Sequence, residues 1–147
     1  MICVKYKIIS IGNQWVILRV ENGDSEAVGK IIPKTNNSII ILFETQKINL
    51  TSRFVGENIF FSMKAEELIL RSNLRTTQKQ SLVWKQENKL NDFYKCIKHK
   101  DLYYLKQSNQ TLAKLKEISN KYYLLELNQS TKLSYAVILA CFFPLLN

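Results

Sequence analysis

The fold is decided by the last segment of the chain, Leu133–Asn147, which reads LSYAVILACFFPLLN and carries no charged side chain. From Ala136 to Phe143 the only polar group is the thiol of Cys141. The apolar run from Tyr135 to Leu146 has about 12 residues, which at about 1.5 Å per residue makes roughly 18 Å of helix. A bilayer core is about 30 Å thick, so this helix is too short to span it. We therefore expect a buried core helix.

This predicted helix is apolar on every side. A helix on the surface of a soluble protein keeps a polar face, so a helix without one has to be enclosed. Pro144 removes a backbone donor and therefore limits the last turn. The sequence thus predicts that the rest of the chain forms a wall around this segment.

Most of the chain before the tail has the pattern of short β-strands. Val4–Ile8 alternates, Gln14–Val20 is rich in β-formers, and Asn22-Gly23 predicts a hairpin turn before Ala27–Ile32. Further candidate strands follow at a spacing close to ten residues: Ile39–Phe43, Lys47–Leu50, Arg53–Val55, Asn58–Met63, Leu82–Lys85, Phe93–Lys98, Leu102–Lys106, Thr111–Ile118 and Lys121–Leu127. This spacing indicates an antiparallel barrel or sandwich. The exception is Ser62–Ser72, whose strong helix formers predict one or two helical turns.

Length and composition predict one domain over residues 1–147, which is within the usual single-domain range. The chain has an odd number of cysteines at wide spacings, namely Cys3, Cys96 and Cys141. This pattern is typical of a reduced, cytoplasmic protein without disulfides. The first residues, MICVKYKIISIG, have lysines inside the apolar stretch, so we expect no secretory signal.

The order of elements in the last 60 or so residues resembles that of the tubby C-terminal-like domains, which include scramblase-like and LURP-one-related proteins and small bacterial members. The residues that carry the resemblance are Leu102–Lys106, Leu112–Ile118, Tyr122–Leu127 and Tyr135–Ala140. The resemblance implies a mainly β (α+β) fold, a closed antiparallel β-barrel of short strands around the C-terminal hydrophobic helix. It also implies membrane-related binding, because tubby itself is a phosphoinositide-binding module. No lipid-contacting residue of the family matches a position in this chain.

The net charge of +9 is concentrated in the second half of the chain. Up to Leu74 there are nine Lys and Arg against seven Asp and Glu, and from Arg75 onward there are twelve against five. The most basic stretch predicts an anion-binding or lipid-binding site formed by Lys95, Lys98, His99, Lys100 and Lys106. A strand over Phe93–Lys98 would place Lys95 and Lys98 on opposite faces, so the residues that can converge are those of the following turn. The alternative is an ordinary solvated loop.

No catalytic constellation is found in the sequence, and we expect no enzyme activity, no metal site and no cofactor. His99 has Asp101 as its one neighbouring carboxylate and no nucleophile close to it in sequence. The sequence therefore favours a non-enzymatic cytoplasmic binding domain, peripheral at a membrane, that contacts acidic phospholipid headgroups or an acidic protein partner. The alternative is a nucleic-acid-binding accessory protein that uses lysine and aromatic side chains. The oligomeric state and the ligand stay open.

Overall fold

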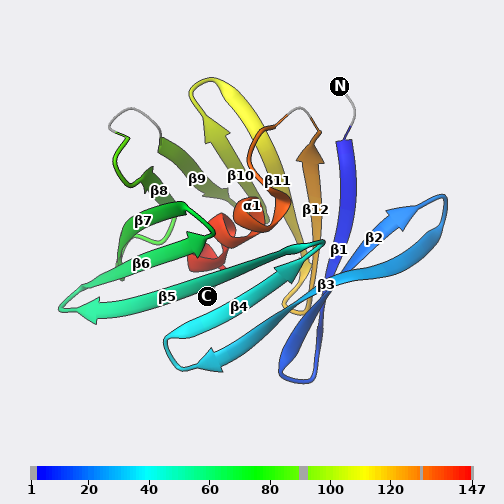
Figure 1. Cartoon of the computed structure of the whole chain (residues 1–147), viewed down its shortest axis with the longest axis horizontal. Helices are drawn as coiled ribbons and strands as arrows, with labels where there is room; N and C mark the ends of the chain where they lie inside the picture. The colour runs from blue at the N-terminus through cyan, green and yellow to red at the C-terminus, as the bar shows by residue number, and fades with distance from the viewer. Residues whose placement is uncertain (1–2, 90–92, 130, 147) are drawn as a thin grey trace.

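The computed structural model describes residues 3–89, 93–129 and 131–146. The chain forms a closed antiparallel barrel in which each strand pairs with the next along the chain and β12 pairs back with β1 (Figure 1). The strands are β1 Cys3–Ile11, β2 Gln14–Glu21, β3 Asp24–Thr35, β4 Ser38–Phe43, β5 Gln46–Val55, β6 Asn58–Ala65, β7 Leu68–Arg75, β8 Ser81–Gln86, β9 Phe93–His99, β10 Leu102–Gln107, β11 Gln110–Ser119 and β12 Tyr122–Asn128. The predicted mainly β barrel is confirmed.

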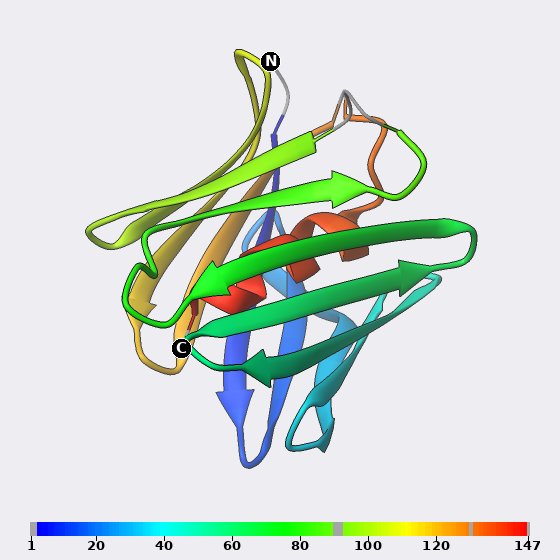
Figure 2. The ribbon, with the colours of Figure 1, turned by 90° about the vertical axis from the view of Figure 1, so that its left-hand side faces the viewer.

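The predicted C-terminal helix is also confirmed. It is α1, Tyr135–Phe142, and the 3₁₀ helix η1, Phe143–Leu145, follows it directly. Ser134 caps α1, since its Oγ accepts a hydrogen bond of 3.2 Å from the backbone N–H of Val137. In Figure 2 the helix crosses the interior of the barrel. Within the described residues, no helix has the length and hydrophobicity needed to cross a bilayer.

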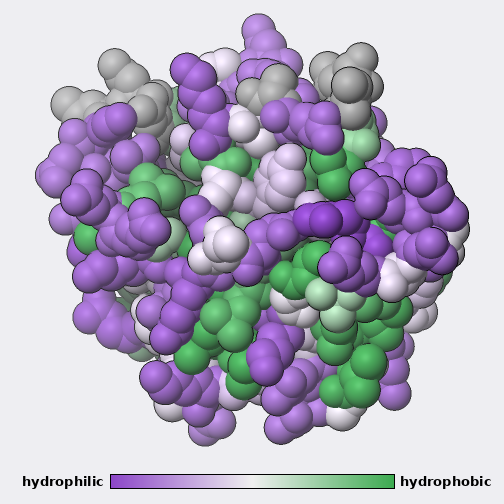
Figure 3. Space-filling model, turned by 45° about the vertical axis from the view of Figure 1, so that its right-hand side comes forward, coloured by the Kyte–Doolittle hydropathy of each residue, from purple (hydrophilic) through white to green (hydrophobic). Residues whose placement is uncertain are grey.

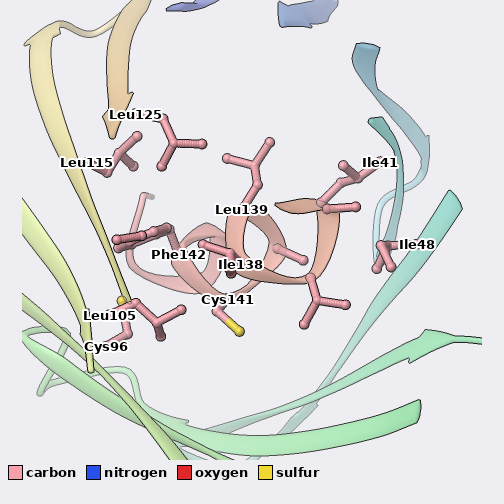
Figure 4. Packing of buried hydrophobic residues seen from close by; sticks show 14 of the residues in the cluster. Ile41, Ile48, Cys96, Leu105, Leu115, Leu125, Ile138, Leu139, Cys141 and Phe142 are labelled. Carbon is pink, nitrogen blue, oxygen red and sulfur yellow. The ribbon is translucent and has the colours of Figure 1, made fainter. Parts of the chain in front are cut away.

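The barrel encloses the helix on all sides, which explains why α1 has no polar face. Every residue from Ala136 to Phe142 is buried. In the view of Figure 4, α1 lies in the middle of the barrel, with leucines of β10, β11 and β12 on one side and isoleucines of β4 and β5 on the other. Trp84 of β8 fixes the helix to the wall, because its Nε1 donates a buried hydrogen bond of 3.0 Å to the carbonyl of Cys141.

The helical turns predicted at Ser62–Ser72 are wrong. This segment is the end of β6 and the start of β7, joined by a tight turn in which Glu66 has a φ of 53°. In β7, residues Leu70 and Leu74 are buried while the residues that follow them are exposed, which is the period of two of a strand. Burial against the helix therefore outweighs the helix propensity of the local residues.

Other local predictions are confirmed or extended. Asn22 and Gly23 both have positive φ, at 50° and 83°, as the predicted hairpin turn between β2 and β3 requires. The two predicted strands Lys47–Leu50 and Arg53–Val55 are parts of the single strand β5. In β3, a Cβ atom at Gly29 would lie 2.2 Å from the carbonyl oxygen of Leu42 in β4, so this position requires glycine for close approach of the two backbones.

The two ends of the barrel differ. At one end, which we call the η1 end, the strands β1, β3, β5, β7, β9 and β11 finish, and η1 lies beneath their turns. Most neighbouring strands are paired along their length, but β7 and β8 pair at only two positions, Leu70 with Gln86 and Arg71 with Lys85. Beyond Arg71 the backbone pairing of these two strands ends, although the Oγ of Ser72 still donates a hydrogen bond of 2.6 Å to the carbonyl of Val83. The loop Thr76–Gln80 connects the two strands at the η1 end.

Candidate functional site

Backbone hydrogen bonds join the turns of the η1 end into a continuous rim. Each bond attaches the turn of one hairpin to the first strand of the next hairpin or, in the case of Thr76, to the loop that follows that strand. The bonds run from Ser52 N to Asn37 O (2.8 Å), Thr76 N to Glu57 O (2.9 Å), Lys98 N to Gln80 O (2.8 Å), Glu117 N to Asp101 O (2.8 Å) and Ser10 N to Lys121 O (2.9 Å). The turns are therefore held in fixed positions next to one another, although they are distant in sequence.

A hollow of about 1010 Å³, which we call the basic hollow, opens in this rim. It lies between the loop that joins β7 to β8 and the end of β9, and it is lined by Thr76, Thr77, Gln78, Lys79, Gln80, Ser81, Lys98, His99 and Lys100. The bond between Lys98 and Gln80 holds the end of β9 against the loop after β7. The hollow is thus lined by three Lys, one His and several amides and hydroxyls. This combination suits an oxyanion such as phosphate or carboxylate.

The structure separates the five predicted site residues into two groups. Lys98, His99 and Lys100 line the basic hollow. Lys95 and Lys106 are directly opposite each other on β9 and β10 and do not line it. Along β9, Tyr94 and Cys96 are buried whereas Phe93 and Lys95 are exposed, so Lys95 is on the outer side of the wall. The predicted division of the lysines between two faces is therefore present in the structure.

The lysines of the basic hollow have no carboxylate partner in the described part of the chain. The ion pairs found there involve other residues: Lys5 with Glu126, Arg19 with Glu26 and Glu44, and Arg71 with Glu87. Lys98 lies over the ring of Tyr103, with its Nζ 5.5 Å from the ring centroid. Burial raises the pKa of Tyr103, and the neighbouring charge of Lys98 opposes this increase. Within the described residues, the lysines of the hollow thus form no ion pair with an acid.

Exposed apolar side chains lie at the same end of the barrel as the basic hollow. In the described residues, six large hydrophobic side chains are exposed: Ile11, Phe54, Val55, Phe60, Phe93 and Ile118. All except Phe93 lie on strands close to a hairpin turn of the η1 end. Phe54 and Ile11 are the most accessible, with 63% and 61% exposed. Figure 3, which brings the right-hand side of Figure 1 forward, shows apolar patches between hydrophilic side chains in the lower half of the molecule.

The loop between β7 and β8 contributes a part of the site that was not predicted from the sequence. Lys79 and its polar neighbours Thr76–Gln80 belong to no predicted element. The available signal was that this run contains no apolar residue, and such a run between strands is typical of a loop. Its position beside Lys98 depends on strand order and could not be obtained from local sequence.

Nucleophilic and metal-binding groups do not gather at the hollow. Cys96 and Cys141 are buried in the core, and burial raises the pKa of both thiols, so they stay protonated and unreactive. Cys3 is exposed at the opposite end of the barrel. Among the described residues, no group of three or more His, Cys, Asp and Glu could hold a metal ion.

Comparisons with known proteins give no relative. No family model matches the chain, no curated protein matches it, and no solved structure matches the fold. The resemblance to the tubby C-terminal-like domains therefore stays a prediction, and the function has to be inferred from the site itself.

Proposed function

We propose that this protein is a non-enzymatic binding domain that attaches peripherally to anionic membranes through the η1 end of its barrel. The observation that carries the proposal is that the basic hollow and five of the six exposed large apolar side chains lie at the same end. A bilayer offers both kinds of partner, since anionic headgroups cover an apolar layer.

The energies are sufficient for weak, reversible attachment. A lysine close to an anionic surface contributes about 1 kcal/mol, so Lys79, Lys98 and Lys100 together supply about 3 kcal/mol at low salt. Complete burial of a Phe side chain contributes roughly 1.5–3 kcal/mol. Phe54 is more than half exposed at the tip of the β5–β6 hairpin, so part of this gain is available when it enters the headgroup region.

The same end fits the other candidate partners less well. Nucleic-acid phosphates would match the lysines, and the exposed Phe rings could stack on bases. A base cannot stack on an aliphatic side chain, however, and three of the exposed side chains at this end are aliphatic: Ile11, Val55 and Ile118. An acidic protein would match the charge, but the exposed apolar side chains are distributed over three hairpins, whereas binding energy in a protein interface is concentrated in a few central residues.

The test is co-sedimentation with vesicles of phosphatidylcholine alone and of phosphatidylcholine mixed with phosphatidylserine, over a series of salt concentrations. We expect binding only to the mixed vesicles, and less binding as salt rises. Replacing Lys79 and Lys100 by Gln should weaken binding about 25-fold, which corresponds to about 2 kcal/mol. The matched control replaces Lys95 and Lys106 by Gln, which removes the same charge from the outer wall and should have a much smaller effect.

A second variant, Phe54→Ser, tests the apolar contribution. The side chain is exposed, so we expect no loss of folding but weaker vesicle binding with an unchanged salt dependence. Equal sedimentation with both kinds of vesicle at low salt, or equal effects of the two lysine pairs, would contradict the proposal. Binding to duplex DNA with a steep salt dependence, in the absence of vesicle binding, would replace it by the nucleic-acid function.

A further inference from the structure

A second cavity at the η1 end, which we call the apolar pocket, lies between the end of the core helix and the barrel wall. Its volume is about 350 Å³. It is lined by residues of β1, β2, β11 and β12, of α1 and of the segment after it: Ile8, Trp15, Leu115, Asn120, Tyr123, Leu139, Phe143 and Leu146. None of these residues lines the basic hollow, so the two cavities are distinct.

The chemistry of the lining restricts what can enter the apolar pocket. All the lining side chains except Asn120 are aliphatic or aromatic. The hydroxyl of Tyr123 is already used, because it donates a hydrogen bond of 3.1 Å to Oε1 of Glu117. Burial and the charge of Glu117 raise the pKa of Tyr123, so the hydroxyl stays neutral. A charged group inside the pocket would find no side chain of opposite charge, and only the indole N–H of Trp15 and the amide of Asn120 could bond to it. The part of a ligand that enters therefore has to be uncharged.

The volume sets the size of the occupant. At about 30 Å³ for each water-sized group, the pocket has room for roughly a dozen such groups. Cavities lined by aliphatic and aromatic side chains bind small hydrocarbons. A flexible saturated chain of about ten carbons fills such a space without requiring a particular ring shape. Trp15 and Tyr123, whose ring centroids are 5.6 Å apart, form one wall against which the chain can pack.

The location of the pocket indicates where the polar end of this ligand would lie. Asn120 belongs to the turn between β11 and β12, and Lys121 follows it in the same turn. The backbone of Lys121 is bonded to Ser10, which fixes this turn in the rim of the η1 end. A polar headgroup at the entrance would thus meet the amide of Asn120, while the chain lies inside.

We propose that the apolar pocket binds one saturated acyl chain of about ten carbons, with its polar head beside Asn120 at the η1 end. The pocket itself stands independently of membrane attachment. Only the further step, in which a bilayer lipid supplies the chain, rests on the proposed function.

The first experiment titrates decanol, below its solubility limit, into the intact protein while tryptophan emission and Tm are recorded. The chain has two tryptophans, and Trp15 lines the apolar pocket whereas Trp84 is fully buried elsewhere in the core. We expect a saturable change in emission and a Tm that rises with decanol concentration, because the ligand binds the folded state. The variant Leu146→Phe fills the pocket from its rim and should weaken binding about tenfold or more.

Two further variants keep this experiment decisive. Asn120→Phe narrows the pocket from an exposed turn and replaces Leu146→Phe if that variant fails to fold. Asn73→Phe makes the same substitution at an exposed position of β7 that lines neither cavity, and it should bind decanol like the original chain. The absence of any saturable change in emission or Tm overturns the proposal, and so does equal binding by the pocket variants and by Asn73→Phe.

A second arm identifies the source of the chain. Vesicles that contain phosphatidylserine and lipids brominated on their acyl chains should quench Trp15, and a pocket-blocking variant should be quenched less. Decanol binding without this quenching supports the pocket and overturns the bilayer as the source of the chain. Vesicle attachment without decanol binding overturns the pocket and leaves the proposed function in place, so the two failures can be distinguished.

Discussion

The enclosure of α1 predicts a large loss of stability for Ile138→Ala. Ile138 has no exposed surface and lies in the middle of the helix, inside the barrel (Figure 4). The substitution removes methyl and methylene groups worth about 0.8 kcal/mol each and leaves a cavity, so Ile→Ala in a core costs about 2–5 kcal/mol. Alanine has the higher helix propensity, which offsets only a few tenths of a kcal/mol. We therefore expect a loss of about 3 kcal/mol and a Tm lower by roughly 10 °C.

The assay is unfolding in urea, followed by tryptophan fluorescence. Trp84 is a suitable probe because its side chain is fully buried and bonded to the backbone of α1. The matched control is Ile118→Ala, which makes the same change at a half-exposed position of β11 and should cost less than about 1 kcal/mol. A loss below about 1 kcal/mol for Ile138→Ala, or equal losses for the two variants, would refute the enclosure of the helix by the barrel.

Three further predictions follow from the packing and from the pKa shifts. Gly29→Ala should destabilise the fold by about 1–3 kcal/mol in urea unfolding, because the added Cβ meets the carbonyl oxygen of Leu42. A thiol reagent at mildly alkaline pH should label only Cys3 in the native chain and all three cysteines in urea, because burial raises the pKa of the other two. Tyr123 should titrate above its ordinary pKa of 10.0 in an ultraviolet pH titration, and Glu117→Gln should lower its pKa toward that value.

The Tyr123 shift also has a consequence for stability. Its pKa is raised in the folded state, so the folded chain holds this proton when the unfolded chain has lost it. The contribution is fully present below pH 10.0 and decreases as the pH rises from there toward the folded pKa. As the pH rises above 10.0, the free energy of unfolding should therefore fall less steeply for Glu117→Gln than for the original chain. The packing prediction is contradicted if Gly29→Ala leaves the stability unchanged. The cysteine prediction is contradicted if all three thiols are labelled rapidly in the native chain. The titration prediction is contradicted if Tyr123 titrates at its ordinary pKa.

The candidate site could be predicted from sequence only where its residues are neighbours in the chain. Lys98, His99 and Lys100 follow one another at a turn, and the structure places them in one hollow. Lys106 is near them in sequence but lies on the outer wall beside Lys95, because its position along β10 is set by the pairing register. Lys79 joins the hollow from a different hairpin through strand order. Neither the pairing register nor the strand order can be obtained from the spacing of residues along the chain.

The sequence by itself determined that the last segment is a buried helix and that strands enclose it. An uncharged run of this length, apolar in every direction, has few stable environments apart from a protein interior, and the alternating strands before it supply the wall. The tertiary structure alone decided that Ser62–Ser72 is a hairpin and that the loop between β7 and β8 lies beside Lys98. Both depend on contacts between residues distant in the chain, where burial against α1 and the closure of the barrel outweigh local propensity.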